Sequence, residues 1–146
     1  MLVTSDLMTV SPFTVAPETT LREIVNMMNM EGCRHLPVVD GERLVGIVTD
    51  RDVRMVLNSP ILEDNQLQNE ASLDTVLAES IMTSDPITVT PNTPAYRAAE
   101  MLSIYKYGAL PVVADKRDGH RTLVGIVTVT DFIEHFRKTQ KTPTAV

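Results

Sequence analysis

The sequence predicts an α+β fold built from two tandem copies of one β-α-β-β-α unit. The 146-residue chain contains an internal repeat. Each copy carries the same succession of short apolar runs and of apolar residues at helical spacing. A repeat of about 55 residues is too small to bury a good hydrophobic core alone. We therefore expect the two copies to pack against each other.

The repeat is visible in two aligned blocks. Residues 8–39 and 82–113 are identical at 12 of 32 positions, and both blocks begin with Met-Thr and end with Leu-Pro-Val-Val. The segment LVGIVTDRD at 44–52 returns at 123–131 as LVGIVTVTD, with 7 identities in 9 positions. The offset changes from 74 to 79 between the blocks because the second copy carries extra residues in KRDGHRT. Such a match indicates a duplication.

The first half of the first copy combines an extended piece with a helix. Residues 13–15 lie between two prolines and are expected to be extended. Thr19 or Thr20 offers a helix N-cap, and Thr20 with Glu23 fits a capping box. The apolar residues that follow recur at i, i+3, i+4 and i+7, as in an amphipathic helix. Gly32 is expected to end this helix.

A hairpin and a second helix complete the first copy. The apolar run 36–39 ends at Asp40-Gly41, a two-residue hairpin signal, and 44–48 is the returning strand. Thr49 then opens a helix that continues through Leu57. The predicted order is β-α-β-β-α.

The second copy follows the same plan. Residues 87–89 are expected to be extended, Thr93 to cap a helix, and Pro94 to occupy its first helical position. Residues 109–113 and 123–127 are the paired strands. The remaining helical residues of this copy are Ala95, Ala98, Ala99, Leu102, Asp131, Phe132 and Phe136.

The segment between the copies is polar and acidic. We expect a loop or a loosely ordered excursion over 58–71, after which Ser72 can cap a short helix through Leu77. The predicted organisation is repeat 1 at 1–57, a linker with a short helix at 58–78, repeat 2 at 79–137, and a flexible tail at 138–146.

Composition excludes several classes of protein. The net charge of −6 argues against general nucleic-acid binding, which needs a dense positive field. Cys33 is the single cysteine, which excludes an intrachain disulfide and a multi-Cys zinc site. The sequence shows no membrane-spanning apolar run and no signal peptide, so we expect a cytoplasmic protein. No metal-ligand spacing and no catalytic constellation is visible.

The duplicated motifs resemble the CBS domain. The segments MT-x-x-P-x-T-V-x-P, L-P-V-V and G-I-V-T-x-x-D occur in this order twice, and they cover residues 6–57 and 79–136. The chain is similar to small stand-alone bacterial proteins that consist of one CBS pair, or Bateman module. The resemblance implies pseudo-twofold packing of the repeats, with two clefts between them that hold AMP, ADP, ATP or S-adenosylmethionine in many members. It also implies a homodimer, a flat disc of four repeats.

The resemblance places the ligand contacts at two strand-to-helix corners. It implies that Thr49 and Thr128 contact phosphate, and that Asp52 and Asp131 accept hydrogen bonds from ribose hydroxyls. Such a corner suits an anion because it exposes free backbone N–H groups and the positive end of a helix dipole. The glycine three residues before each threonine would let a ligand approach closely. The same Thr-x-x-Asp pattern is a helix capping box, and a residue can serve both purposes.

Basic residues accompany only the first corner. Arg34 and His35 are candidates for phosphate contact, although they also fit a solvated pair at a turn, and Arg51 adds positive charge nearby. In the second copy Gly108-Ala109 replaces Arg34-His35, so we expect the two sites to differ. Gly108 and Ala109 are themselves candidate contacts that make room for a purine ring, and the other candidate ligand contacts are Pro12, Thr14, Pro37, Pro86, Ile87, Pro111 and Thr130.

Other side chains fit structural roles better. Tyr105 and Tyr107 could stack on adenine, but we expect them to pack in the core. The methionines at helical spacing are expected to fill the core or a dimer interface.

These expectations describe a regulatory sensor without catalytic activity and without a required cofactor. Its ligand would be an adenine nucleotide, and its protein partners would be a second copy and an unidentified regulated protein. The alternatives are a ligand-free structural dimerisation module, an S-adenosylmethionine binder, and an enzyme that acts on a nucleotide.

Overall fold

The computed structural model describes residues 1–57, 65–115 and 119–141. It divides into two compact units, which we name after the repeat that supplies most of each. The first-repeat unit comprises Pro12–Pro86 and Asp115–Leu123, and the second-repeat unit comprises Met1–Ser11, Ile87–Ala114 and Val124–Val146.

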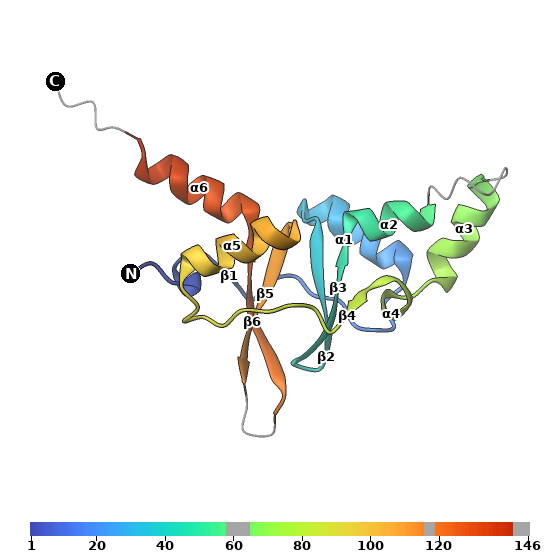
Figure 1. The fold of residues 1–146 in the computed structure, drawn as a ribbon. Coiled ribbons are helices and arrows are strands. Elements are labelled where there is room, and N and C mark those ends of the chain that lie inside the picture. The colour runs from blue at the N-terminus through green and yellow to red at the C-terminus, as the bar shows by residue number, and fades with distance from the viewer. Residues whose placement is uncertain (58–64, 116–118, 142–146) are drawn as a thin grey trace. The chain divides into compact units, whose positions relative to one another are not determined.

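The first-repeat unit holds the helices and the hairpin predicted for the first repeat, followed by elements from the segment between the repeats (Figure 1). In chain order these elements are α1 (Leu21–Glu31), β2 (His35–Asp40), β3 (Arg43–Thr49), α2 (Asp50–Leu57), α3 (Asn65–Thr75), α4 (Ala78–Ile81) and β4 (Thr83–Ser84).

The predicted ends of α1 are confirmed. The Thr20 hydroxyl accepts from the Glu23 N–H at 3.3 Å, and a Glu23 carboxylate oxygen accepts from the Thr20 N–H at 3.0 Å. This reciprocal pair satisfies two amides that the helix itself leaves unbonded. Gly32 ends α1 in the left-handed conformation with φ 66°.

The β2–β3 hairpin is confirmed, but its turn lies one residue later than predicted. Asp40 pairs with Arg43, so the loop residues are Gly41 and Glu42. Gly41 has φ +63°, a conformation that glycine adopts without steric cost. Asp40 therefore ends β2 and does not form the turn.

The predicted extended piece at 13–15 does not form a strand. Val15 makes a single parallel bridge with Val38, and in the second-repeat unit Val89 bridges Val112 in the same way. These isolated bridges take the place of the strands expected at 13–15 and 87–89.

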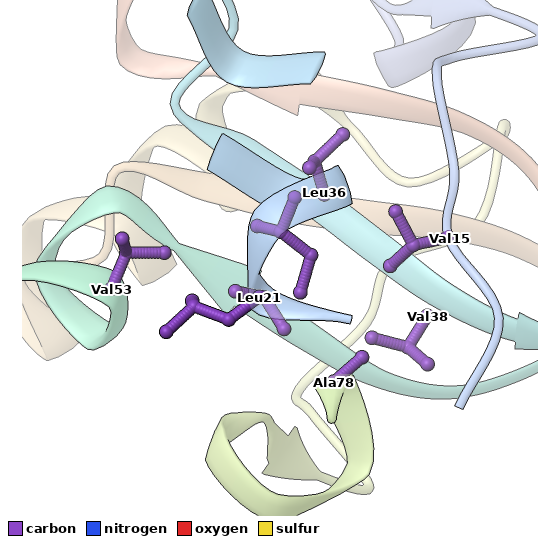
Figure 2. Close-up of a cluster of buried hydrophobic side chains, with 8 residues drawn as sticks. Val15, Leu21, Leu36, Val38, Val53 and Ala78 are labelled. Carbon is purple, nitrogen blue, oxygen red and sulfur yellow. The ribbon is translucent and has the colours of Figure 1, made fainter. Parts of the chain in front are cut away.

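A buried cluster between the helices and the hairpin forms the core of the first-repeat unit. Figure 2 shows Leu21 from α1, Leu36 and Val38 from β2, and Val53 from α2 converging on it. The eight buried members are Val15, Leu21, Ile24, Leu36, Val38, Val48, Val53 and Ala78. Because Ala78 of α4 is fully buried here, the segment between the repeats completes this core.

The segment between the repeats is more helical than the sequence predicts. Ser72 does not cap a helix, because it lies inside α3, where its carbonyl accepts from the Val76 N–H at 3.0 Å. Leu73 packs against the core, and Arg22 of α1 forms an ion pair with Asp74 at 2.8 Å. Residues 58–64, the first half of the predicted loop, lie outside the described residues.

The second-repeat unit repeats this plan around its own core. The elements that it holds, wholly or in large part, are the 3₁₀ turn Thr4–Asp6, β1 (Thr9–Val10), α5 (Ala95–Tyr105), β5 (Ala109–Asp115), β6 (Arg121–Thr128) and α6 (Val129–Thr139). The buried residues of its core cluster are Val89, Ala98, Leu102, Leu110, Val112 and Val127.

The N-terminus of α5 differs from its prediction by one residue. Pro94 is the N-cap, and the helix begins at Ala95. The Thr93 hydroxyl accepts from the preceding Thr90 N–H at 3.0 Å and does not cap the helix. The cause is the substitution at the capping position itself, since Pro94 stands where the first repeat has Thr20 and offers no side-chain oxygen.

The leading segment of each repeat pairs with the other repeat. β1 pairs with β6, with Thr9 opposite Ile126, and β4 pairs with β3, with Thr83 opposite Ile47. The compact units therefore do not follow the repeat boundaries drawn from the sequence.

The last helix is longer than predicted. Helix α6 continues through Thr139, so the predicted tail at 138–146 begins inside a helix. No helix among the described residues is long and apolar enough to cross a membrane.

Candidate functional site

The first strand-to-helix corner is a closed capping box. Thr49 ends β3, and α2 starts at Asp50. The Asp52 Oδ2 atom accepts from the Thr49 N–H at 2.9 Å and from the Thr49 hydroxyl at 3.0 Å. The Asp52 N–H donates to the Thr49 hydroxyl oxygen at 3.2 Å. The capping alternative weighed from the sequence is therefore realised at this corner.

These bonds satisfy most of the amides that were expected to be free. A helix leaves its first four N–H groups without intrahelical partners. At this corner the N–H groups of Thr49 and Asp52 bond within the box, and the Asp50 N–H donates to the Arg34 carbonyl at 2.9 Å. Only the Arg51 N–H of the four has no partner among the described residues. The expectation of several bare amides is therefore wrong, and one amide remains.

The second corner has the same backbone plan. The Thr128 N–H donates to Asp131 Oδ2 at 2.8 Å, and the Asp131 N–H donates to the Thr128 hydroxyl oxygen at 3.2 Å. The Val129 N–H donates to the Gly108 carbonyl at 3.0 Å, so the Thr130 N–H is the one amide of this corner that has no partner among the described residues. The two corners are thus built alike from the two repeats.

The two corners differ in whether the threonine hydroxyl donates a hydrogen bond. Thr49 gives its proton to Asp52, whereas the Thr128 hydroxyl donates to no acceptor within residues 1–57, 65–115 and 119–141. A hydroxyl has only one proton to donate. The second corner therefore keeps a donor that the first corner uses internally. At both corners the aspartate side chain is partly exposed, and its Oδ1 atom makes no hydrogen bond within those residues.

His35 and Arg34 lie beside the first corner. His35 pairs with Thr49 in the β2–β3 register, so the two side chains share one face of the hairpin. Burial lowers the pKa of His35; Asp50 opposes this shift and Arg34 adds to it. At neutral pH the imidazole is therefore uncharged and can offer a phosphate one N–H but no positive charge. Positive charge at this corner comes from the guanidinium groups of Arg34 and Arg51, which are both exposed.

Arg34 also borders a cavity of about 450 Å³ between α1 and α2. Neither Thr49 nor Asp52 lines it, so this cavity is distinct from the capping box. Burial raises the pKa of the Cys33 thiol at its edge, which favours the protonated form. The lining residues are Val25, Met28, Asn29, Gly32, Cys33, Arg34, Asp50, Val53 and Arg54. No sequence pattern predicts this cavity, because its lining is spread over two helices and a turn.

The remaining candidates in the first-repeat unit occupy different environments. The segment with Pro12 and Thr14 leads into Val15, whose N–H donates to the Pro37 carbonyl at 3.0 Å. Pro12 and Thr14 are partly exposed. Pro37 is fully buried and Pro86 is buried, so these two rings serve packing. Arg51 is exposed at the first turn of α2.

In the second-repeat unit the candidates divide in the same way. Pro111 is fully buried and Ala109 is buried, whereas Gly108 and Thr130 are exposed. Ile87 packs partly buried against the second core. Of these five residues, Gly108 and Thr130 are the ones that lie open beside the second corner.

The glycines before each corner make room for the protein itself. A Cβ on Gly46 would overlap the Met82 sulfur and lie 3.0 Å from the Thr83 carbonyl oxygen. A Cβ on Gly125 would lie 2.8 Å from the Met8 sulfur. The expectation that these glycines admit a ligand is therefore wrong. They admit the Met-Thr segment that pairs with the other repeat.

Tyr105 and Tyr107 do not pack in the core as expected. Their rings stack on each other with centroids 5.6 Å apart, and they are 51% and 42% exposed. Lys106 between them adopts a left-handed conformation at the C-cap of α5, which brings the two rings to the same side.

The fold and the corners define a class of protein: a tandem pair of α+β repeats, each with a Thr-x-x-Asp box where its hairpin meets its last helix. The family model for the CBS domain matches residues 3–59 and 78–138. The chain belongs to the CBS domain family, as its motifs indicated.

The most similar proteins include stand-alone CBS pairs. A CBS domain-containing protein of Dictyostelium discoideum is 34% identical, over 91% of this chain and 90% of its own length. The structure of CBSX2 in complex with AMP matches with a TM-score of 0.77 and 25% identity, over 97% of this chain and 100% of that one. The CBS domain pair of protein MJ0100, in complex with 5′-methylthioadenosine and S-adenosyl-L-methionine, matches with a TM-score of 0.76 and 27% identity, over 96% and 99% of the two chains.

The chain is also similar to one part of a larger enzyme. Inosine-5′-monophosphate dehydrogenase of Korarchaeum cryptofilum is 36% identical over 81% of this chain, but this chain spans only 21% of that protein. The similarity is thus confined to a segment the size of a CBS pair.

Proposed function

We propose that this chain is a regulatory module that binds an adenine nucleotide, AMP, ADP or ATP, at its strand-to-helix corners. The observation that carries the proposal is the aspartate at each corner, which is held by one oxygen and open at the other. Similar structures that contain AMP, or 5′-methylthioadenosine and S-adenosyl-L-methionine, support an adenosine-containing ligand.

The corner aspartates suit the ribose of such a ligand. The capping box fixes the carboxylates of Asp52 and Asp131 through Oδ2 and leaves Oδ1 as an acceptor. A carboxylate whose orientation is already fixed loses little conformational freedom when it accepts a hydroxyl. The cap and the ribose contact are therefore compatible roles for one side chain.

The phosphate end would be recognised differently at the two corners. The first corner supplies the exposed cation of Arg34 and the Arg51 N–H, and its Thr49 proton is already used. The second corner supplies the Thr128 hydroxyl and the Thr130 N–H. We therefore propose sites of unequal affinity, with charge attraction dominant at the first and neutral donors at the second.

Binding would regulate by changing how the chain packs. A ligand shifts a conformational equilibrium only if its affinity differs between the two states. We propose that the responsive assembly is a homodimer that controls a further protein, and that no bond in the ligand is broken. Because adenine nucleotides are cytoplasmic metabolites, the proposal places the chain in the cytoplasm.

S-adenosylmethionine is the second candidate ligand. The MJ0100 pair that contains it is similar over nearly the whole of this chain. This ligand shares the adenosine group but carries a cationic sulfonium in place of phosphate. It would therefore gain little from Arg34 and would favour the second corner.

Calorimetric titration with AMP, ADP, ATP, S-adenosylmethionine and 2′-deoxy-AMP tests the proposal. We expect at least one ribonucleotide to bind, and 2′-deoxy-AMP to bind more weakly than AMP. The changes Asp52→Asn and Asp131→Asn should each weaken AMP binding at one site by about tenfold, the value of one hydrogen bond to a charged group. In each variant, the affinities for AMP and for 2′-deoxy-AMP should also differ less at that site than they do in the unmodified chain.

Asp40→Asn is the matched control. It removes the same charge from an exposed residue at the far end of the hairpin and should leave binding unchanged. Absence of binding by all five ligands would favour the structural dimerisation module. Conversion of ATP to a new product on incubation would favour the enzyme.

A further inference from the structure

A cavity of about 320 Å³ lies at the end of β3 that is remote from the Thr49 corner. Arg43 begins this strand and Thr49 ends it, and its seven residues span about 20 Å. The adenylate site proposed above therefore does not include this cavity. Three segments line it, through Arg43 and Leu44, Ser84 and Asp85, and Gly119 and Arg121. All three belong to the first-repeat unit.

Two arginine side chains border the cavity and differ in their partners. Arg121 is partly buried, forms an ion pair with Asp85 and donates to the Pro86 carbonyl at 3.4 Å, so the position of its charge is fixed. Arg43 is exposed, and its guanidinium has no hydrogen bond or ion pair to a residue that the structure describes. One positive charge at the cavity is therefore balanced by Asp85, and the other is available to a ligand.

The duplication shows that the hairpin does not need these two arginines. At the offset of 79 residues, Arg43 corresponds to Thr122 and Arg121 corresponds to Glu42. Arg43 and Thr122 pair with each other between β3 and β6, so they occupy equivalent places in the two hairpins. One of these places holds a neutral side chain and the other a cation. Folding of the hairpin therefore does not explain the free guanidinium of Arg43.

The donors around the cavity suit a phosphate group. A guanidinium can give two parallel N–H bonds to two phosphate oxygens. The Ser84 hydroxyl is exposed and has no partner among the described residues, so its proton is available to a further oxygen. A carboxylate has fewer oxygens and a lower charge than a phosphate dianion. It would therefore gain less from Arg43 and from the fixed charge of Arg121.

We propose that this cavity binds a small anion through a phosphate group, as free phosphate or as a phosphate monoester. Arg43 and Ser84 donate hydrogen bonds, and the charge of Arg121 adds attraction. The bound group would tie together β3, β4 and the start of β6, which are far apart in the sequence. The site does not depend on the adenylate proposal, because none of the described residues that line it belongs to either strand-to-helix corner.

Titration of the full chain, followed by nuclear magnetic resonance of its backbone amides, tests the site. The probes are inorganic phosphate and glycerol phosphate, at constant ionic strength because salt screens exposed charges. We expect saturable shifts of the amides of Arg43, Ser84 and Gly119. Tighter binding of glycerol phosphate would identify a monoester as the ligand class, and equal or tighter binding of inorganic phosphate would identify the free ion.

Arg43→Gln should raise the phosphate dissociation constant by about tenfold, because it removes a charged hydrogen-bond donor from the ligand. Arg97→Gln is the matched control, since Arg97 on α5 is also exposed and its side chain also has no partner in the described part of the chain. It should leave the dissociation constant unchanged. Arg43→Thr covers the case in which Arg43→Gln fails to fold, because Thr122 occupies the equivalent place in the other hairpin.

Equal phosphate affinity of Arg43→Gln and the unmodified chain would overturn the inference. So would the absence of saturable shifts with both probes, or tighter binding of the dicarboxylate malonate at the same amides. The adenylate proposal fails separately, because Arg43→Gln should leave AMP binding at the strand-to-helix corners unchanged. A chain that binds phosphate in this cavity but no adenylate overturns the ligand proposal alone, and a chain that binds AMP but neither phosphate probe overturns this inference alone.

Discussion

Met82 lies against Gly46 so closely that a Cβ on the glycine would overlap the methionine sulfur and come 2.8 Å from its Cγ. Met8 stands in the same relation to Gly125, with its sulfur 2.8 Å from the position of the Cβ. In both cases the methionine immediately precedes the short strand that pairs with the other repeat. The glycine of the G-I-V-T motif is therefore required by this crossing strand.

Gly46→Ala should destabilise the chain because the added methyl group displaces Met82. Inserting a methyl group into a packed core costs about 1–3 kcal/mol. Denaturation in urea, followed by circular dichroism, measures this cost. The same substitution in a Met82→Ala background is the control, and there the cost should fall, which gives a favourable coupling in the double-mutant cycle. An unchanged cost would show that the Thr83 backbone, 3.0 Å away, limits the approach.

The capping box at the first corner should contribute measurably to stability. Thr49→Ala removes the hydroxyl that accepts from Asp52, and loss of an N-cap side chain costs about 0.5–2 kcal/mol. Asp52→Asn should cost less than Asp52→Ala, since the amide oxygen of asparagine can still accept from the Thr49 N–H. Urea midpoints of the three variants check this order. Equal midpoints for the two changes at position 52 would argue against the box as a stabilising element.

His35 should make stability depend on pH near neutrality. Burial lowers its pKa in the folded chain, whereas an unfolded histidine titrates at about 6.5. Below that value the unfolded chain therefore binds a proton that the folded chain does not. The free energy of unfolding should decrease as the pH falls from about 7 through 6.5 toward the lower folded pKa. Urea midpoints across this range measure the effect.

His35→Asn should reduce this loss of stability, since asparagine does not titrate. His135→Asn is the control, because it removes an imidazole from the other unit. The exposed carboxyls of Asp74 and Glu134 also have lowered pKa values, held down by hydrogen bonds from Arg22 and Arg137. Their contribution to the free energy of unfolding is lost only at more acidic pH, so it does not overlap the pH range in which His35 acts. If the free energy of unfolding of His35→Asn depends on pH as strongly as that of the unmodified chain, His35 is not the group responsible.

The features that the sequence predicted correctly are formed by residues that lie close together in the chain. The Thr20–Glu23 box and the Thr49–Asp52 corner are formed by residues three positions apart, so the residue types alone indicate their geometry. The hairpin was equally recognisable, because its strands are adjacent in sequence. Its turn was displaced by one residue because Asp40 pairs with Arg43, and a turn signal of the form Asp-Gly does not determine which residue makes the last pair.

What the sequence could not predict depends on distant contacts. Gly46 and Met82 are 36 positions apart, and β4 has only two residues, too few to show an alternating pattern. The sequence therefore predicts the wrong role for this glycine, because the crossing strand that it admits cannot be recognised from the sequence. Helix α3 was missed for a related reason: Leu73 packs against the core, but a single such residue in a polar segment gives no helical periodicity.

The free hydroxyl of Thr128 should matter more for phosphate than the occupied hydroxyl of Thr49. Thr49→Val and Thr128→Val remove the same atoms and weaken the same kind of cap, so they form a matched pair. Only the second removes a hydroxyl whose proton is available to a ligand.

Titration with AMP and with adenosine separates the contribution of the phosphate to the binding free energy from that of the nucleoside. We expect Thr128→Val to reduce the preference for AMP over adenosine at the second corner by about tenfold, the loss of one hydrogen bond to a charged group. Thr49→Val should leave the preference at the first corner nearly unchanged, since Arg34 and the Arg51 N–H remain there. An equal loss in both variants would mean that Thr49 releases Asp52 when the ligand binds, and that the bond between them is exchanged for one to phosphate.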